Sequence, residues 1–119
     1  MGSVQFMEYE GKQMLLLDFS NCKPEEIMQL IGESKKIIQK QLRNSVLTIT
    51  YVKDAVFNSE VIDAMKDFAL SNKDYVRAGC IVGLSGLQKT IYTVVMKFSG
   101  RNLPIFDTLE EAKKWLVKN

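Results

Sequence analysis

Asn58 and Ser59 place an amide and a hydroxyl between a β-type run, residues 46–51, and a helical run whose apolar stripe begins at Val61. The amino terminus of a helix presents unpaired N–H groups and a partial positive charge, which attract anions. A phosphate added to Ser59 would therefore meet a receptive site. Asn and Ser are also common N-cap residues. The pair supports two interpretations, a plain helix cap and a phospho-acceptor at Ser59.

Residues 83–90, GLSGLQKT, nearly match the phosphate-binding pattern G-x-x-x-x-G-K-[ST] and follow an apolar run. Gln88 stands where that pattern requires glycine, and its side chain would obstruct the approach of the backbone to phosphates. Ser85 and Gln88 instead have the spacing of a capping box. We expect no nucleotide hydrolysis here. Passive binding of an anion by this turn and Lys89 stays open as an alternative.

The groups that commonly perform catalysis are missing or isolated. The chain has no histidine, and Cys22 and Cys80 stand alone in the sequence, so the usual general base and a zinc site are both absent. Ser59 and Ser85 therefore lack the histidine that a catalytic triad needs. We expect a protein that is not an enzyme and that uses no cofactor and no metal.

Length and composition narrow the class further. At 119 residues, with 46% apolar and 25% charged side chains, the chain is long enough for one globular domain over residues 1–119. A formal charge of +2, with scattered lysines, argues against nucleic-acid binding. Two unpaired cysteines, no signal-peptide pattern and no apolar run near 20 residues predict a cytoplasmic protein without a membrane span.

The first half of the chain predicts a hairpin followed by β-α units. Residues 4–9 and 13–18 have strand character, and Glu10 and Gly11 between them allow a tight antiparallel turn. Small polar residues from Ser20 onward, followed by Pro24, predict a helix start, and apolar residues then recur at helical spacing as far as Leu42. Residues 46–51 form a third strand, and residues 61–69 the buried stripe of a second helix.

The second half repeats the same alternation. Residues 75–82 are almost continuously small or apolar, as expected of a central strand. A third helix should run from the Ser85 box to Gly100, and residues 103–106 should form a short edge strand because they include Pro104. Asp107 should cap the last helix with Glu110 completing the box, so that residues 109, 112, 115 and 116 face inward.

The resulting order, ββαβαβαβα, predicts an α/β fold in which a five-stranded mixed sheet starts with an antiparallel hairpin and continues in parallel, with four helices. Turns at the carboxyl ends of parallel strands gather at one edge, where such sheets bind ligands. We therefore expect one partner or ligand surface there, formed by Ser20, Asn21, Asn58, Ser59, Gly83, Ser85, Gly86 and Lys89.

The third predicted helix has a second property. Residues 91–96, IYTVVM, are apolar around much of the helix circumference. A helix packed on a sheet needs only one apolar face. We expect part of this helix to contact something beyond the sheet: a partner chain, a second copy of the protein or a lipid.

The element order, together with Phe57, Asn58 and Ser59 leading into a helix, resembles the STAS domains, the anti-sigma-factor antagonists of the SpoIIAA type. That family has an Asp-Ser-(Ser)-Gly turn after its third strand, in which a partner kinase phosphorylates a serine. Here the serine position matches Ser59, Asn58 replaces the acid, and Glu60 follows the serine. The segment KFSGRNLPIFDTLEEAKKWL, residues 97–116, is similar to the small, mostly uncharacterised bacterial SpoIIAA-like proteins.

The resemblance implies a right-handed β-α superhelix, also seen in lipid-binding CRAL-TRIO domains; it does not imply one settled activity. Two hypotheses follow. The first is a non-enzymatic regulatory or protein-interaction domain, with a kinase or an anti-sigma-like regulator as partner and Ser59 as a phospho-switch. The second is a carrier or sensor of a small lipid-like or anionic ligand, bound at the carboxyl ends of the strands.

Overall fold

The computed structural model describes residues 2–119, which form five strands and four helices. The elements in chain order are β1 (Ser3–Tyr9), β2 (Lys12–Asp18), α1 (Pro24–Gln39), β3 (Val46–Tyr51), α2 (Ser59–Asn72), β4 (Val76–Val82), α3 (Gly86–Ser99), β5 (Ile105–Phe106) and α4 (Leu109–Leu116). This is the predicted ββαβαβαβα order.

The five strands form one sheet in the order β1-β2-β3-β4-β5. β1 and β2 pair antiparallel through a turn in which Glu10 and Gly11 have φ of 48° and 84°. Two consecutive residues with positive φ give the twist that a two-residue hairpin requires, and glycine adopts this conformation without a Cβ clash. The other neighbouring pairs are parallel. The predicted mixed sheet is therefore confirmed.

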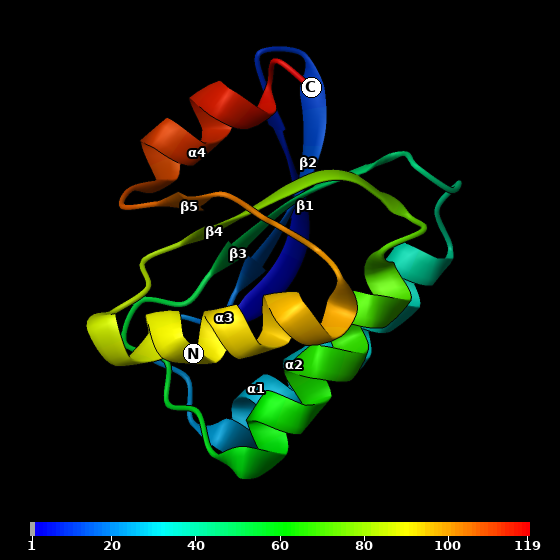
Figure 1. The fold of residues 1–119 in the computed structure, drawn as a ribbon. Helices are drawn as coiled ribbons and strands as arrows, with labels where there is room; N and C mark the ends of the chain where they lie inside the picture. Colours follow the sequence, from blue (N-terminus) through cyan, green and yellow to red (C-terminus); the bar gives the residue numbers. More distant parts are fainter. Residues whose placement is uncertain (1) are drawn as a thin grey trace.

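The sequential strand order decides where the helices lie. Each parallel crossover from β2 to β5 moves one strand further in the same direction, and right-handed crossovers then place every connecting helix on the same face. Figure 1 shows α1, α2 and α3 together on one side of the sheet, with α4 alone on the other. The sheet has no point at which the strand order reverses, so it has no switch-point crevice of the kind that doubly wound sheets use for ligands.

Alternation along the strands divides the core into two layers. In β3, Val46 packs with the residues beneath α1 and α2, whereas Leu47 and Ile49 pack with Ala112 and Leu116 of α4. Successive strand residues point to opposite faces, so a strand covered on both sides is apolar throughout. The nearly continuous apolar character of β3 and β4 has this origin.

Two predicted helix starts were displaced. The N-cap of α1 is Lys23, whose backbone N–H donates to Glu26 Oε1 at 2.9 Å, so Ser20 and Asn21 belong to the preceding turn. The N-cap of α4 is Thr108, which accepts from the Glu111 backbone N–H at 3.2 Å. The prediction that Asp107 and Glu110 form this cap is wrong by one residue. Aspartate and threonine both cap helices well, so the local sequence pattern alone did not show whether Asp107 or Thr108 is the N-cap.

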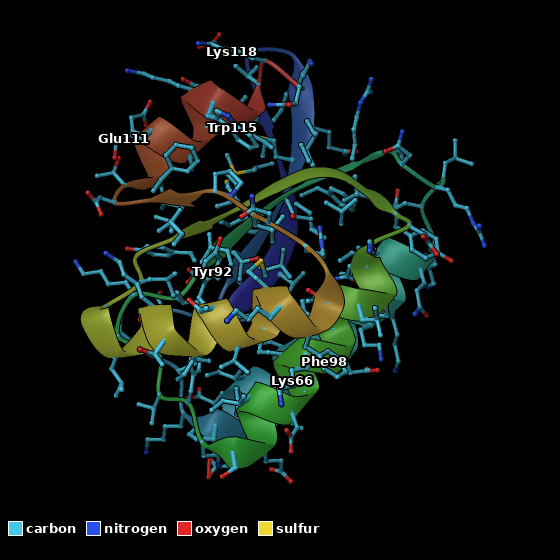
Figure 2. The ribbon with its side chains drawn as sticks, in the orientation of Figure 1. Lys66, Tyr92, Phe98, Glu111, Trp115 and Lys118 are labelled. Atoms are coloured by element: carbon cyan, nitrogen blue, oxygen red, sulfur yellow. The ribbon has the colours of Figure 1, made fainter. Side chains whose placement is uncertain are left out.

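Two apolar residues are less buried than their spacing suggested. Leu42 lies beyond the end of α1 and is 81% exposed, so it does not extend the buried stripe of that helix. Trp115 is only partly buried, with its ring centroid 5.7 Å from that of Phe106, the last residue of the edge strand β5. Figure 2 shows the Trp115 side chain extending from α4 toward the sheet. α4 thus closes the core mainly through Ala112 and Leu116.

Within residues 2–119 we find no helix with the length and apolar content needed to cross a bilayer.

Candidate functional site

The turns after β3, β4 and β5 meet around a cleft of about 590 Å³. The predicted convergence of four turns is thus present for three of them, whereas the turn after β2 does not line the cleft. The cleft is lined by Tyr51, Lys53, Asp54, Ala55, Gly83, Leu84, Ser85, Gln88, Asp107, Thr108 and Leu109. Of the eight predicted surface residues, only Gly83 and Ser85 line it. Lys53 and Asp54, which the sequence analysis did not single out, contribute exposed charges of opposite sign.

The structure places Ser59 where the sequence predicted it. Asn58 is the N-cap of α2, and its Oδ1 accepts from the Val61 backbone N–H at 2.9 Å. Ser59 is the first residue of the helix and is exposed. The cap function therefore belongs to Asn58, which leaves the Ser59 hydroxyl at the helix amino terminus and accessible to a modifying enzyme. Whether Ser59 is phosphorylated stays a prediction.

The turn before α3 is the predicted capping box. The Gln88 backbone N–H donates to Ser85 Oγ at 3.3 Å, and the Ser85 backbone N–H donates to Gln88 Oε1 at 2.9 Å. Gly86 and Lys89 are exposed on the outside of this turn. The side chains of Ser85 and Gln88 both form hydrogen bonds within the protein. The residues that nearly match a phosphate-binding loop therefore serve to cap α3. Anion binding by this turn stays a prediction.

Gln88 also has a role that the sequence analysis missed. Its Nε2 donates to two buried backbone carbonyls of the β3–α2 loop, Ala55 O at 2.9 Å and Val52 O at 3.3 Å. The single side chain thus joins the start of α3 to the loop that leads to Ser59. Its apolar surroundings give no local sequence signal of this contact, because the partners are 33 and 36 residues away.

Ser20 and Asn21 stabilise the turn after β2. Asp18 Oδ1 accepts from the Ser20 backbone N–H at 3.0 Å and from its hydroxyl at 2.6 Å. Asn21 has a positive φ of 57°, which asparagine tolerates better than most residues. Its backbone N–H donates to Lys53 O at 2.9 Å. Ser20 thus stabilises its own turn, Asn21 joins that turn to the one after β3, and neither residue lines the cleft.

The two thiols are unsuited to nucleophilic chemistry. Cys22 and Cys80 are both free and fully buried. Burial raises the pKa of the Cys22 thiol, and it raises the pKa of Cys80 to about 12, so Cys80 stays a neutral thiol at physiological pH. Among residues 2–119, no group of three Asp, Glu, Cys or His side chains has a geometry that would hold a metal ion.

The surface of α3 is unusual for a helix packed on a sheet. Its buried side chains are Gln88, Val95 and Ser99, whereas Leu87, Val94 and Phe98 are 77%, 43% and 56% exposed. Their spacing of seven and four residues places them on one face of the helix. Phe98 lies beside α2, with Lys66 Nζ 5.6 Å from its ring centroid (Figure 2). Val94 of the predicted segment 91–96 thus faces outward, and a contact of this face with another molecule stays a prediction.

Comparisons with known proteins identify the fold. No protein-family model matches the chain, and a search of curated proteins found no similar sequence. The chain resembles the crystal structure of an uncharacterised protein of the DUF3478 family, with a SpoIIAA-like fold, from Shewanella loihica PV-4. The TM-score is 0.73 at 12% sequence identity, over 97% of this chain and 93% of that one. At this identity the likeness shows the fold: the chain has a SpoIIAA-like α/β fold, as the sequence resemblance implied.

Proposed function

We propose that this protein is a non-enzymatic regulatory domain that binds a protein partner through α3. The observation that carries the proposal is the line of Leu87, Val94 and Phe98 on the exposed side of that helix. Phe98 lies eleven positions after Leu87, which at a rise of 1.5 Å per residue is about 16 Å, the length of one short docking helix. Burying such side chains is a main source of binding free energy, and monomeric proteins seldom leave them aligned in water.

Charge indicates the chemistry of the partner. Between Asp74 and Asp107 the chain contains no acidic residue, and the exposed side chains of α3 include the cations Lys89 and Lys97. Lys66 of α2 adds a further cation next to Phe98. A helix that carries apolar anchors flanked by Asp or Glu complements this surface. A symmetric pair of α3 helices would instead bring like charges together, which disfavours a second copy as the occupant.

Ser59 is suited to control this surface. The loop before Ser59 packs against α3: Phe57 lines a cavity together with Leu84 and Ile91, and Gln88 is bonded to Ala55. A phosphate on Ser59 would add about −1.5 to −2 charges at the amino terminus of α2, where the helix dipole and free N–H groups favour an anion. If the phosphate shifted the β3–α2 loop, the contacts of Phe57 and Gln88 would shift the first turns of α3 as well. A kinase is the second partner that this proposal requires.

The proposal is tested by photo-crosslinking in the native host. A photoreactive amino acid at Val94 should give an adduct with one distinct protein, and the added Phe98→Lys substitution should abolish that adduct. Leu42, an exposed apolar residue outside the helices, is the matched control position and should give none. Equal labelling at both positions, or an adduct with the mass of two copies of this chain, would contradict the proposal.

The regulatory part has its own measurement. Mass spectrometry of protein purified from the native host should find phosphate on Ser59, and Ser59→Ala should change the yield of the Val94 adduct. Ser71, a partly buried serine in the last turn of α2, is the control residue and should carry no phosphate. Unmodified Ser59 under all growth conditions in which the adduct forms would remove the switch and leave only the interaction surface.

A further inference from the structure

A cavity of about 60 Å³ lies between the sheet and the helices α2 and α3, away from the exposed face of α3. Thr48 and Thr50 of β3 line it at strand positions where Ile or Leu would fill more of the space. Gly79 lies next to these residues, and a Cβ there would lie 2.6 Å from Thr48 Oγ1, which leaves little room for a side chain. Such polar and small residues are unusual in the middle of a core that is otherwise apolar.

Arg101 reaches this cavity from the segment after α3. Its Nη1 donates to Ala69 O at 3.2 Å, one of the last carbonyls of α2, which a cation at a helix carboxyl terminus commonly satisfies. The guanidinium has five N–H donors, and among residues 2–119 no carboxylate forms an ion pair with it. Burial lowers the pKa of the Arg101 guanidinium, because partial removal from water disfavours its charged form.

Asn72 supplies a second polar group in the same cavity. The residue is 5% exposed and lines the cavity at the end of α2. Among residues 2–119, its Oδ1 is the one buried side-chain polar atom that has no hydrogen-bond partner. A buried acceptor without a donor is costly, and native proteins rarely retain one unless water or a ligand satisfies it. The cavity thus offers a cationic donor and a neutral acceptor.

A neighbouring cavity, also of about 60 Å³, continues beneath α3 toward Phe57 and Leu84. The two cavities share Thr50, Met65, Ile81, Val95 and Met96 as lining residues. A water molecule needs about 10–15 Å³ measured in this way, so each cavity has room for roughly four to six water-sized groups. Methionine side chains are flexible and adapt to the shape of a bound group. The second cavity is therefore suited to a short hydrocarbon chain.

We propose that the two cavities together bind a short aliphatic hydroxy acid. The carboxylate accepts hydrogen bonds from the Arg101 guanidinium, and the hydroxyl donates to Asn72 Oδ1. The hydrocarbon end lies among Met65, Val95 and Met96. This site is separate from the α3 surface of the proposed function, and a bound ligand would act on that surface by fixing the packing of α3 on the sheet.

The test uses the full chain and three small probes of equal carbon number, followed by NMR of the backbone amides. 3-Hydroxyhexanoate has both recognised groups, hexanoate lacks the hydroxyl, and 1,3-hexanediol lacks the carboxylate. We expect saturable shifts at the end of α2 and along α3, with affinity highest for 3-hydroxyhexanoate, several-fold lower for hexanoate and undetectable for the diol.

Variants assign the two contacts. Arg101→Gln should lower the affinity for both acids at least tenfold, whereas Lys97→Gln, which removes an exposed charge from the same part of the chain, should leave it unchanged. Asn72→Leu should make the two acids bind equally. If Arg101→Gln does not fold, Thr50→Leu decides the question, since a larger side chain in the shared lining must weaken hexanoate binding.

Three results would overturn the proposal. The first is the absence of saturable shifts with either acid at millimolar concentration. The second is unchanged binding in Arg101→Gln or in Thr50→Leu. The third is a set of shifts confined to the carboxyl-end cleft around Lys53 and Ser85, which would place the ligand at the other site.

Discussion

Gln88→Ala should destabilise the protein far more than its place in a surface capping box suggests. The substitution removes the acceptor for the Ser85 backbone N–H and the donor for Val52 O and Ala55 O. Loss of one side of a cap costs about 0.5–2 kcal/mol, and each buried carbonyl that loses its donor costs about 1–3 kcal/mol. Val52 O keeps the Ala55 backbone N–H as a donor at 3.1 Å, so only Ala55 O is left without a partner, and we expect a total of about 2–4 kcal/mol.

Urea unfolding, followed by far-UV circular dichroism, measures the change in the free energy of unfolding, and thermal unfolding measures the change in Tm. At this chain length each kcal/mol lowers the Tm by about 3–5 °C, so the Tm of Gln88→Ala should fall by roughly 6–20 °C. Lys89→Ala alters the exposed neighbour in the same turn and should change stability by less than about 0.5 kcal/mol. Hydrogen exchange should also quicken at the amides of the β3–α2 loop, because Gln88 holds its carbonyls.

Gln88→Glu separates the two roles of the side chain. A carboxylate can still accept from Ser85, but it cannot donate to Val52 and Ala55, so it should be as destabilising as alanine at neutral pH. Gln88→Gly, which completes the phosphate-binding pattern, should lose the same contacts and gain no ATPase activity. If Gln88→Ala and Lys89→Ala were equally stable, the bonds from Nε2 to the loop would contribute nothing and our reasoning would be refuted.

Three other predictions concern individual contacts. Thr108→Ala should lower the free energy of unfolding by about 1 kcal/mol and Asp107→Ala by much less, as measured by urea unfolding; the reverse order would restore Asp107 as the cap. Gly79→Ala should destabilise the protein because its Cβ meets Thr48 Oγ1, and Thr48→Ala in the same chain should recover much of the loss; no recovery would point to another clash. The pKa of Cys80 is about 12 in the folded chain and 9.0 in the unfolded chain, so above pH 9 the unfolded chain loses the thiol proton first. The stabilisation that the neutral thiol gives to the folded state is therefore complete below pH 9 and declines as the pH rises toward 12. Between pH 8 and pH 10.5, Cys80→Ala should therefore lose about 2 kcal/mol less stability than the native chain, at 1.36 kcal/mol per pH unit; equal losses would show that the thiol ionises freely.

Local patterns determined the elements and their order. The alternation of apolar runs with helical stripes placed all five strands and four helices, because burial of one face imposes a period of two on strands and of 3.6 on helices. The single helical layer formed by α1, α2 and α3 required in addition the sequential strand order of the folded sheet, which together with right-handed crossovers puts these helices on one face. Short-range chemistry also identified the capping box of Ser85 and Gln88, and it limited the cap of α2 to Asn58 or Ser59, of which the structure shows Asn58.

The tertiary structure decided which of the predicted surface residues meet. Four strand-to-helix turns reach the carboxyl edge, yet only those after β3, β4 and β5 line the cleft, because the twist of the sheet and the loop lengths set their separation. It also decided the partners of Gln88 and the exposure of Phe98, which depend on how α3 lies against α2 and the β3–α2 loop. The pairing of Asn72 and Arg101 around one cavity has the same origin. These contacts join residues about 30 positions apart, and no local periodicity or propensity records which side chains the folded chain brings together.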